Sequence, residues 1–423
     1  MVPTFKVDTS KPYQFINFND LSPWKSLTID LDEVFVVYTN THLLNGEGAH
    51  PSAMHVERKL ADQCFLALAT TYFAHDHHEK GLFERGLTRY GSALSNLHSA
   101  LSDPRRHSSY EILESVILMT LFETLMSNKK DGWIAHSLGM QRLFELRGPE
   151  TFQRNPERNM FEIARPTIIY ASLVMRQRTI LSQRRWKDVP WANDPKEKLL
   201  YHYVVDILAD CPDLICIKDR ALLLEDTEVR LKAMKVFITA ARSKLDELRA
   251  WKATWDAKEP SCCMEISPTS DPPLCQNRNG EVPIKAWKTE YSFKSIYHCV
   301  TIAIYHSLRI HLHRMMKGHD AEADAITLQT AESETFTSGI EICRIVSYHM
   351  EMARKGEGSF AFMFPLRMAW EAVHEQEPNV GKWLQNILAE IATGPTGRWA
   401  VAGYLLNQDE IPTGPRRRPI MNS

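Results

Sequence analysis

Apolar side chains recur three and four residues apart along most of this chain, the spacing that places them on one face of an α-helix. The stripe from Leu60 to Tyr72 repeats every four residues, and the stripe from Leu87 to Leu101 alternates intervals of three and four. Between turn signals, no segment alternates apolar and polar residues with the period of two that is typical of a strand. The pattern predicts an all-α protein, a large helical bundle or array with very little β-strand.

Turn and capping residues indicate where several of these helices begin and end. Asp103-Pro104 ends the leucine stripe, and Ser108 with Glu111 predicts a capping box for a helix from Ile112 to Met126. That helix is apolar on most faces, which favours a place at the centre of the bundle. The next helix ends at Gly148-Pro149. Further helices are predicted over residues 160–183, 199–211, 231–255, 296–315, 340–352, 365–374 and 382–391.

Composition divides the chain into three regions. Residues 1–50 are rich in Pro, Asn, Asp and Thr, with one apolar patch at Val34 to Tyr38, and we expect them to form an extended or loosely packed arm. Residues 51–395 form the helical domain, which holds a loop at about 259–284 where Cys, Ser, Asn and Pro follow no period. Residues 396–423 form a C-terminal tail.

Charge and hydropathy limit the molecules with which the chain interacts. The 50 basic and 52 acidic residues give a net charge of −2, so bulk electrostatics favour neither direct DNA binding nor membrane binding. Residues 1–25 do not resemble a secretory signal, and no uncharged apolar run reaches the ~18 residues of a spanning helix. We expect a protein of the nucleus, and also of the cytosol. The basic run Arg416–Arg418 is either a solvated tail or a minimal nuclear-targeting element.

The sequence lacks the common catalytic and metal-binding signatures. It has no Gly-rich phosphate loop, no G-x-S-x-G and no H-E-x-x-H, and none of its eight cysteines forms a Cys-x-x-Cys pair. His75 and His78 are spaced to share a helix face, but a solvated helix end explains them better. Glu371, His374 and Glu375 are likewise explained by a polar helix surface. We expect no resident metal or cofactor, and no catalysis.

A helical face that carries Trp133, His136, Met140 and Leu143, at spacings of three, four and three, has two interpretations. Either the face packs into the core with His136 hydrogen-bonded inside it, or His136 is a polar anchor in a ligand pocket between helices. Core packing is the simpler interpretation, and it requires no ligand.

Gly132 to Gly139, which reads Gly-Trp-Ile-Ala-His-Ser-Leu-Gly, together with Leu146 to Glu150, resembles the helical regulatory domain of fungal-specific transcription factors. The resemblance covers roughly residues 55–395 and includes further segments in the expected order. These segments are Tyr90–Leu94 with Asp103-Pro104, Leu121–Glu123, Arg178–Leu181, Trp186, Pro190-Trp191, Phe364–Leu366 and Trp383. The resemblance implies a helical regulatory bundle and a role in the nucleus.

Members of that family usually carry an N-terminal binuclear zinc cluster, in which six cysteines hold two zinc ions. This chain departs from the family pattern there, because no cysteine precedes Cys64. Base recognition by such a cluster is therefore excluded for the chain as given. A truncated regulator and a relative without the cluster both remain open. The resemblance then implies that DNA is reached indirectly, through other transcription regulators or a zinc-cluster partner.

Three functional hypotheses follow. The leading one is a transcriptional regulator of a fungal gene set, such as a secondary-metabolite biosynthetic cluster, with a small-molecule effector pocket at Trp133, His136, Arg165 and Arg176. The second is an enzyme or accessory protein of a biosynthetic pathway, in which Arg165, Arg176 and Arg178 converge with His136 in a cavity. The third is a scaffold that dimerises with a zinc-cluster protein. A homodimer is also compatible with the sequence.

Overall fold

Helices make up almost all of the regular structure in the computed structural model, which describes residues 30–43, 59–103, 105–106, 109–127, 130–275, 284–320, 324–354 and 359–393. Within those residues the chain forms thirteen α-helices and a two-stranded antiparallel sheet, which confirms the predicted all-α class. None of the helices described there is long and apolar enough to cross a membrane. Residues 1–29 and 44–50 of the predicted arm, and the tail 396–423, lie outside the described residues.

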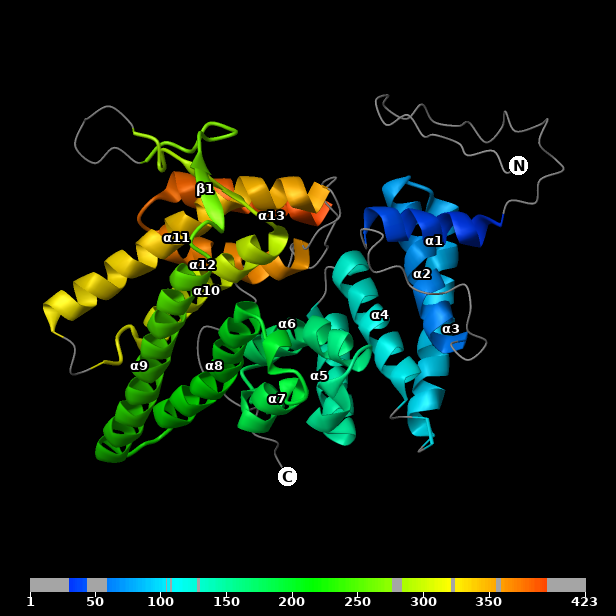
Figure 1. Cartoon of the computed structure of the whole chain (residues 1–423), viewed down its shortest axis with the longest axis horizontal. Helices are drawn as coiled ribbons and strands as arrows, with labels where there is room; N and C mark the ends of the chain where they lie inside the picture. The colour runs from blue at the N-terminus through cyan, green and yellow to red at the C-terminus, as the bar shows by residue number, and fades with distance from the viewer. Residues whose placement is uncertain are drawn as a thin grey trace.

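The N-terminal helices gather at one end of the molecule (Figure 1). They are α1 (Leu31–His42), α2 (Lys59–Asp76), α3 (Lys80–Ser102), α4 (Tyr110–Met126) and α5 (Lys130–Arg147). Helix α2 packs against α1, α3 and α4, and α4 also contacts α5. The side chain of Ser109 caps α4 by accepting a hydrogen bond from the Ile112 amide at 3.3 Å. The N-cap is therefore Ser109, and the predicted Ser108 lies outside the described residues.

The middle of the chain is built around α6 (Glu157–Met175), which follows the 3₁₀ turn η3 (Pro149–Gln153). Helix α6 contacts α4, α5 and α8 (Leu200–Leu222). Residues 177–199, called the crossover segment, connect α6 to α8 through η4 (Ile180–Ser182), α7 (Arg184–Asp188), η5 (Val189–Trp191) and η6 (Pro195–Glu197). Arg176 ends α6 in the left-handed conformation, with φ at 52°, so the helix predicted over 160–183 stops early.

The C-terminal helices pack around α10 at the other end of the molecule (Figure 1). The elements are α9 (Thr227–Lys258), α10 (Ile296–Met316), α11 (Ala325–Arg354), η7 (Ser359–Phe362), α12 (Met363–Val373) and α13 (Pro378–Thr393). Helix α10 contacts α8, α9, α11 and α12. Strand β1 (Cys263–Ile266) lies in the predicted loop 259–284 and pairs with β2 (Glu290–Phe293), with Cys263 opposite Phe293.

Helix α1 differs from the prediction of a loosely packed arm over residues 1–50. Its apolar patch docks on α2, where the Phe35 ring lies 4.9 Å from that of Phe73 and is 2% exposed. The Asp30 side chain caps the helix by accepting from the Asp32 amide. Helix α11 likewise begins before the predicted residue 340. Its first turns are exposed and carry no apolar stripe, so the sequence pattern did not indicate them.

A set of charged side chains lies in the core where α6, the crossover segment and α8 meet. Arg165 of α6 is 1% exposed and forms an ion pair with Asp206 of α8. Lys198 of the crossover segment reaches the other carboxylate oxygen of Asp206 at 2.8 Å. The charged groups of Arg165 and Lys198 each lie 5.1 Å from the ring centre of Trp191, a cation–π distance. We call these four residues the Asp206 cluster, in which one carboxylate compensates two buried cations.

Replacing Asp206 by Asn is expected to lower the free energy of unfolding by about 3–5 kcal/mol, because it leaves the buried Arg165 without its counter-charge. Among the described carboxylates, Lys198 then retains only Asp188, at 4.0 Å. Arg165→Met is expected to cost less, because it leaves the pair between Lys198 and Asp206 intact. Equilibrium denaturation measures both losses. The control is Arg249→Met, which removes an exposed pair with Asp246 and a longer one with Glu334, and it should change stability by less than about 1 kcal/mol. An Arg165→Met variant that is less stable than Asp206→Asn would contradict this ranking.

Candidate functional site

Side chains of α3, α4 and α5 line a groove with a volume of about 390 Å³. Figure 1 shows α4 running between α3 and α5. The base of the groove consists of apolar side chains at most 5% exposed, and its rim of leucines 37–50% exposed: Leu97, Val116 and Leu143 at the base, and Leu94, Leu101 and Leu146 at the rim. Such a volume is within the range of small-molecule sites, about 300–1,000 Å³.

The leucine stripe that predicts α3 divides between two environments. Leu97 is 2% exposed, as the stripe predicts, and forms part of the base of the groove. Leu94 and Leu101, one heptad apart, stand on the edge of that stripe and line the groove. The periodicity therefore identifies the helix, but it does not distinguish leucines that are covered by the chain from those that border a groove.

His136 lines the groove and connects it to a polar network between the three helices. The Tyr90 hydroxyl of α3 lies 2.6 Å from Glu123 Oε1 of α4 and 3.3 Å from His136 Nε2 of α5. The Tyr90 ring stacks on Phe122, with ring centres 4.0 Å apart. We call Tyr90, Glu123 and His136 the Tyr90 network. It links α3, α4 and α5 by hydrogen bonds at one side of the groove.

The Gly-Trp-x-x-His segment at the start of α5 supplies part of this network. Its glycine, tryptophan and histidine each have a different structural role. A Cβ on Gly132 would lie 2.2 Å from Glu123 Oε2, so glycine leaves the room that this carboxylate occupies. Trp133 is 4% exposed and packs in the core. His136 stands one turn further along the helix and reaches Tyr90. The segment thus fixes both the packing of α5 and the position of the imidazole.

Burial determines the protonation of the network. Burial lowers the pKa of His136, and the nearby Glu123 carboxylate opposes this shift without cancelling it. The imidazole is therefore neutral at pH 7. Burial, with the hydrogen bond to Glu123 as the next cause, raises the pKa of Tyr90, so the phenol keeps its proton. At neutral pH the imidazole of His136 therefore takes part in hydrogen bonds in its uncharged form.

The structure separates the residues predicted to share a cavity, which are Trp133, His136, Arg165, Arg176 and Arg178. His136 lines the groove, whereas Trp133 is buried in the core. Arg165 belongs to the Asp206 cluster. Arg176 forms a two-pronged ion pair with Asp219, with Nε at 2.7 Å from Oδ2. Neither arginine lines this groove. Arg178, which is exposed, does not line it either.

Within the described residues, no group of three or more His, Cys, Asp or Glu is placed to hold a metal ion. The end of α2 carries His75 in its last turn, and His77 and His78 follow directly after the helix. The His77 ring stacks on Phe73, with ring centres 4.0 Å apart, and His78 leaves the helix with φ at 58°.

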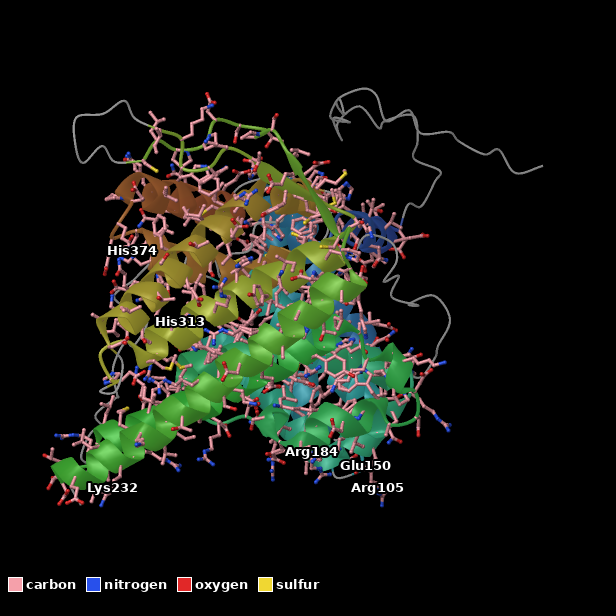
Figure 2. All side chains as sticks on the ribbon, turned by 60° about the vertical axis from the view of Figure 1, so that its left-hand side comes forward. Arg105, Glu150, Arg184, Lys232, His313 and His374 are labelled. Atoms are coloured by element: carbon pink, nitrogen blue, oxygen red, sulfur yellow. The ribbon has the colours of Figure 1, made fainter. Side chains whose placement is uncertain are left out.

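A second cavity of about 390 Å³ lies among α9, α10, α11 and α12, on the side of the molecule where Figure 2 labels His313. His313 Nε2 is 3.0 Å from Glu334, which also pairs with Arg309 at 3.2 Å. Glu371, from the acid–base triplet considered in the sequence, pairs there with Arg314. Four of the side chains that line this cavity are thus engaged with one another in pairs: His313 with Glu334, and Arg314 with Glu371.

The sequence pattern singled out His136, but it did not indicate Tyr90, which His136 contacts, or Glu123, which bonds to Tyr90. Both residues belong to segments that resemble the family, Tyr90–Leu94 and Leu121–Glu123, and this was the available signal. The two residues are 33 positions apart, so no local spacing indicates that they meet.

Replacing Glu123 by Gln is expected to lower the pKa of His136 further, because it removes the carboxylate that raises this pKa. NMR titration of the His136 Cε1–H signal in a chain with labelled histidine measures the shift. Glu145→Gln is the matched control, since Glu145 lies on the same helix as His136 but pairs with Arg142. This variant should leave the titration of His136 unchanged. A constant or raised pKa in Glu123→Gln would contradict the Tyr90 network.

Comparison with known proteins gives this architecture a family. Residues 53–394 match the family model described as the fungal specific transcription factor domain. An uncharacterized protein of Emericella nidulans is 28% identical over 126 residues, which cover 30% of this chain and 27% of the length of that relative. No solved structure matches the chain. The family match takes in α2 to α13, and therefore includes the groove, the Tyr90 network and the Asp206 cluster. The chain belongs to the family of the fungal specific transcription factor domain.

Proposed function

We propose that the chain is a nuclear transcriptional regulator of a fungal gene set. The observation that carries the proposal is the family match over residues 53–394, which is 342 positions of a chain of 423. The regulatory part of the protein is then the helical array itself. The groove of α3, α4 and α5 is its proposed effector site, because it is apolar, has the volume of a small-molecule site and carries a hydrogen-bonding imidazole.

We further propose that the chain reaches DNA through a partner, either a zinc-cluster protein or another transcription regulator. Sequence-specific recognition needs side chains carried into a groove of DNA, together with a set of phosphate contacts. The net charge of −2 supports indirect binding, as does the lack of a Cys-x-x-Cys pair in this sequence.

The gene set proposed for testing is a secondary-metabolite biosynthetic cluster. An apolar groove on a regulator would allow a product or intermediate of such a pathway to act on transcription. A bound molecule changes the regulator's activity if it binds one conformation of the helical array more tightly than another.

Deletion of the gene is expected to change the transcript levels of a coherent set of genes. Chromatin immunoprecipitation of the tagged chain is expected to recover the promoters of the same genes. A strain in which the tagged chain complements the deletion provides the control for the tag. Unchanged transcripts in the deletion strain, or changes confined to promoters that the chain does not occupy, would contradict the proposal.

The purified chain alone is expected to bind a recovered promoter and a scrambled fragment with equally low affinity. The contacts should weaken as salt is added, because they are contacts to phosphates alone. Fluorescence anisotropy at physiological salt measures both affinities, first with the chain alone and then with the co-purified partner. Selective, tight binding by the chain alone would show that it recognises bases itself and would overturn indirect binding.

A further inference from the structure

The groove of α3, α4 and α5 is open at one place where a small change in the sequence would fill it. Gly139 lines the groove, and a Cβ built on it meets no atom within 4 Å. The described part of the chain therefore leaves the space above Gly139 empty. The surrounding side chains are largely apolar, and His136 stands one turn before Gly139 on the same helix.

The protons of the Tyr90 network can be assigned from its distances. Tyr90 has one hydroxyl proton, and its shorter contact, at 2.6 Å, is to the Glu123 carboxylate, which can only accept. The Tyr90 oxygen is then an acceptor for His136, whose Nε2 lies 3.3 Å away and must donate. A neutral imidazole carries a single N–H, so Nδ1 of His136 is left as an acceptor.

Nδ1 of His136 accepts no hydrogen bond from the described residues, where the imidazole bonds through Nε2 to Tyr90. The other titratable or charged side chains that line the groove, His98 and Arg142, do not hydrogen-bond to it. Burial, which lowers the pKa of His136, keeps Nδ1 unprotonated at neutral pH. A molecule in the groove therefore meets mainly apolar side chains and a hydrogen-bond acceptor on His136.

We infer that the groove binds a small apolar molecule that carries one O–H or N–H group, and that this group donates a hydrogen bond to Nδ1 of His136. The carbon skeleton of the ligand packs against the leucines of α3 and α5 and against Val116 of α4. The role of such a molecule as an effector rests on the proposed function, whereas its binding to the groove is a property of the folded chain alone.

Indole and 1-methylindole test this chemistry, because they share a skeleton and only indole has an N–H donor. NMR titration of the full chain, followed at the His136 Cε1–H signal, measures the affinity for each. Indole is expected to bind with a Kd on the order of 1 mM, as its few atoms allow. The affinity for 1-methylindole is expected to be about fivefold lower, which corresponds to one neutral hydrogen bond.

Variants separate the hydrogen bond from the shape of the groove. His136→Phe keeps a ring without the acceptor, and it should bind the two probes equally, with the titration followed on the probe signals. Gly139→Leu should abolish binding of both probes by filling the groove. Gly81→Leu is the matched control, since Gly81 also has nothing within 4 Å of its built Cβ but does not line the groove.

Three results would overturn the inference: no binding of indole by the wild-type chain, equal binding of both probes by the wild-type chain, or a preference for indole that survives in His136→Phe. Light scattering tests another occupant. A wild-type dimer that Gly139→Leu converts to a monomer would show that a second copy fills the groove, which also overturns it. These experiments do not measure transcription. If the chain regulates genes but does not bind the probes, only this inference fails. If it binds the probes but regulates no genes, only the proposed function fails.

Discussion

The ion pair between Arg165 and Asp206 lies at the junction of α6, the crossover segment and α8, and Lys198 completes it. A buried cation loses its hydration, at an effective cost of several kcal/mol, unless a counter-charge and good geometry compensate for it. Asp206 provides that charge for two cations, and the rings of Phe161 and Trp191 lie 5.2 and 5.1 Å from the Arg165 guanidinium. Because these groups are stable only together, the cluster restricts how α6 can pack on α8.

The position of α6 in turn affects the groove. Helix α6 contacts α4 and α5, which supply the base and one wall of the groove, and through α8 it is connected to α9 and α10. At one side of the groove, Tyr90 bonds to both Glu123 and the imidazole of His136, and Gly132 leaves room for the carboxylate. The buried ion pair and the hydrogen-bonded network lie on different helices, and the contacts of α6 with α4 and α5 connect them. This arrangement offers a physical route between the proposed effector site and the C-terminal helices.

The helical class and most helices could be predicted from the sequence, because apolar side chains three and four residues apart indicate a helix. This holds even for Leu87 to Leu101, where Leu87, Leu94 and Leu101 stay exposed. Helix α1 and strand β1 were missed, since both are short elements in segments whose composition resembles a loop.

The candidate site was predicted in part. The placing of His136 in a ligand pocket remains a prediction, and the structure gives it a groove and two partners. Arg165 and Arg176 were grouped with it, but their carboxylate partners stand 41 and 43 positions away in the sequence. No local pattern separates an arginine with a distant partner from one that faces a cavity. The pairing of Tyr90 with Glu123 was beyond prediction for the same reason.

The coupling of the two ends of the molecule through the Asp206 cluster can be measured by hydrogen–deuterium exchange of the full chain, with wild type compared to Asp206→Asn under native conditions. Weakening the contact between α6 and α8 should raise the exchange of backbone amides on both sides, in α4 and α5 as well as in α8 and α9. If the increase is confined to α8 and the crossover segment, the cluster stabilises only the elements that carry it. That result would contradict the claim that the cluster couples the two ends of the molecule.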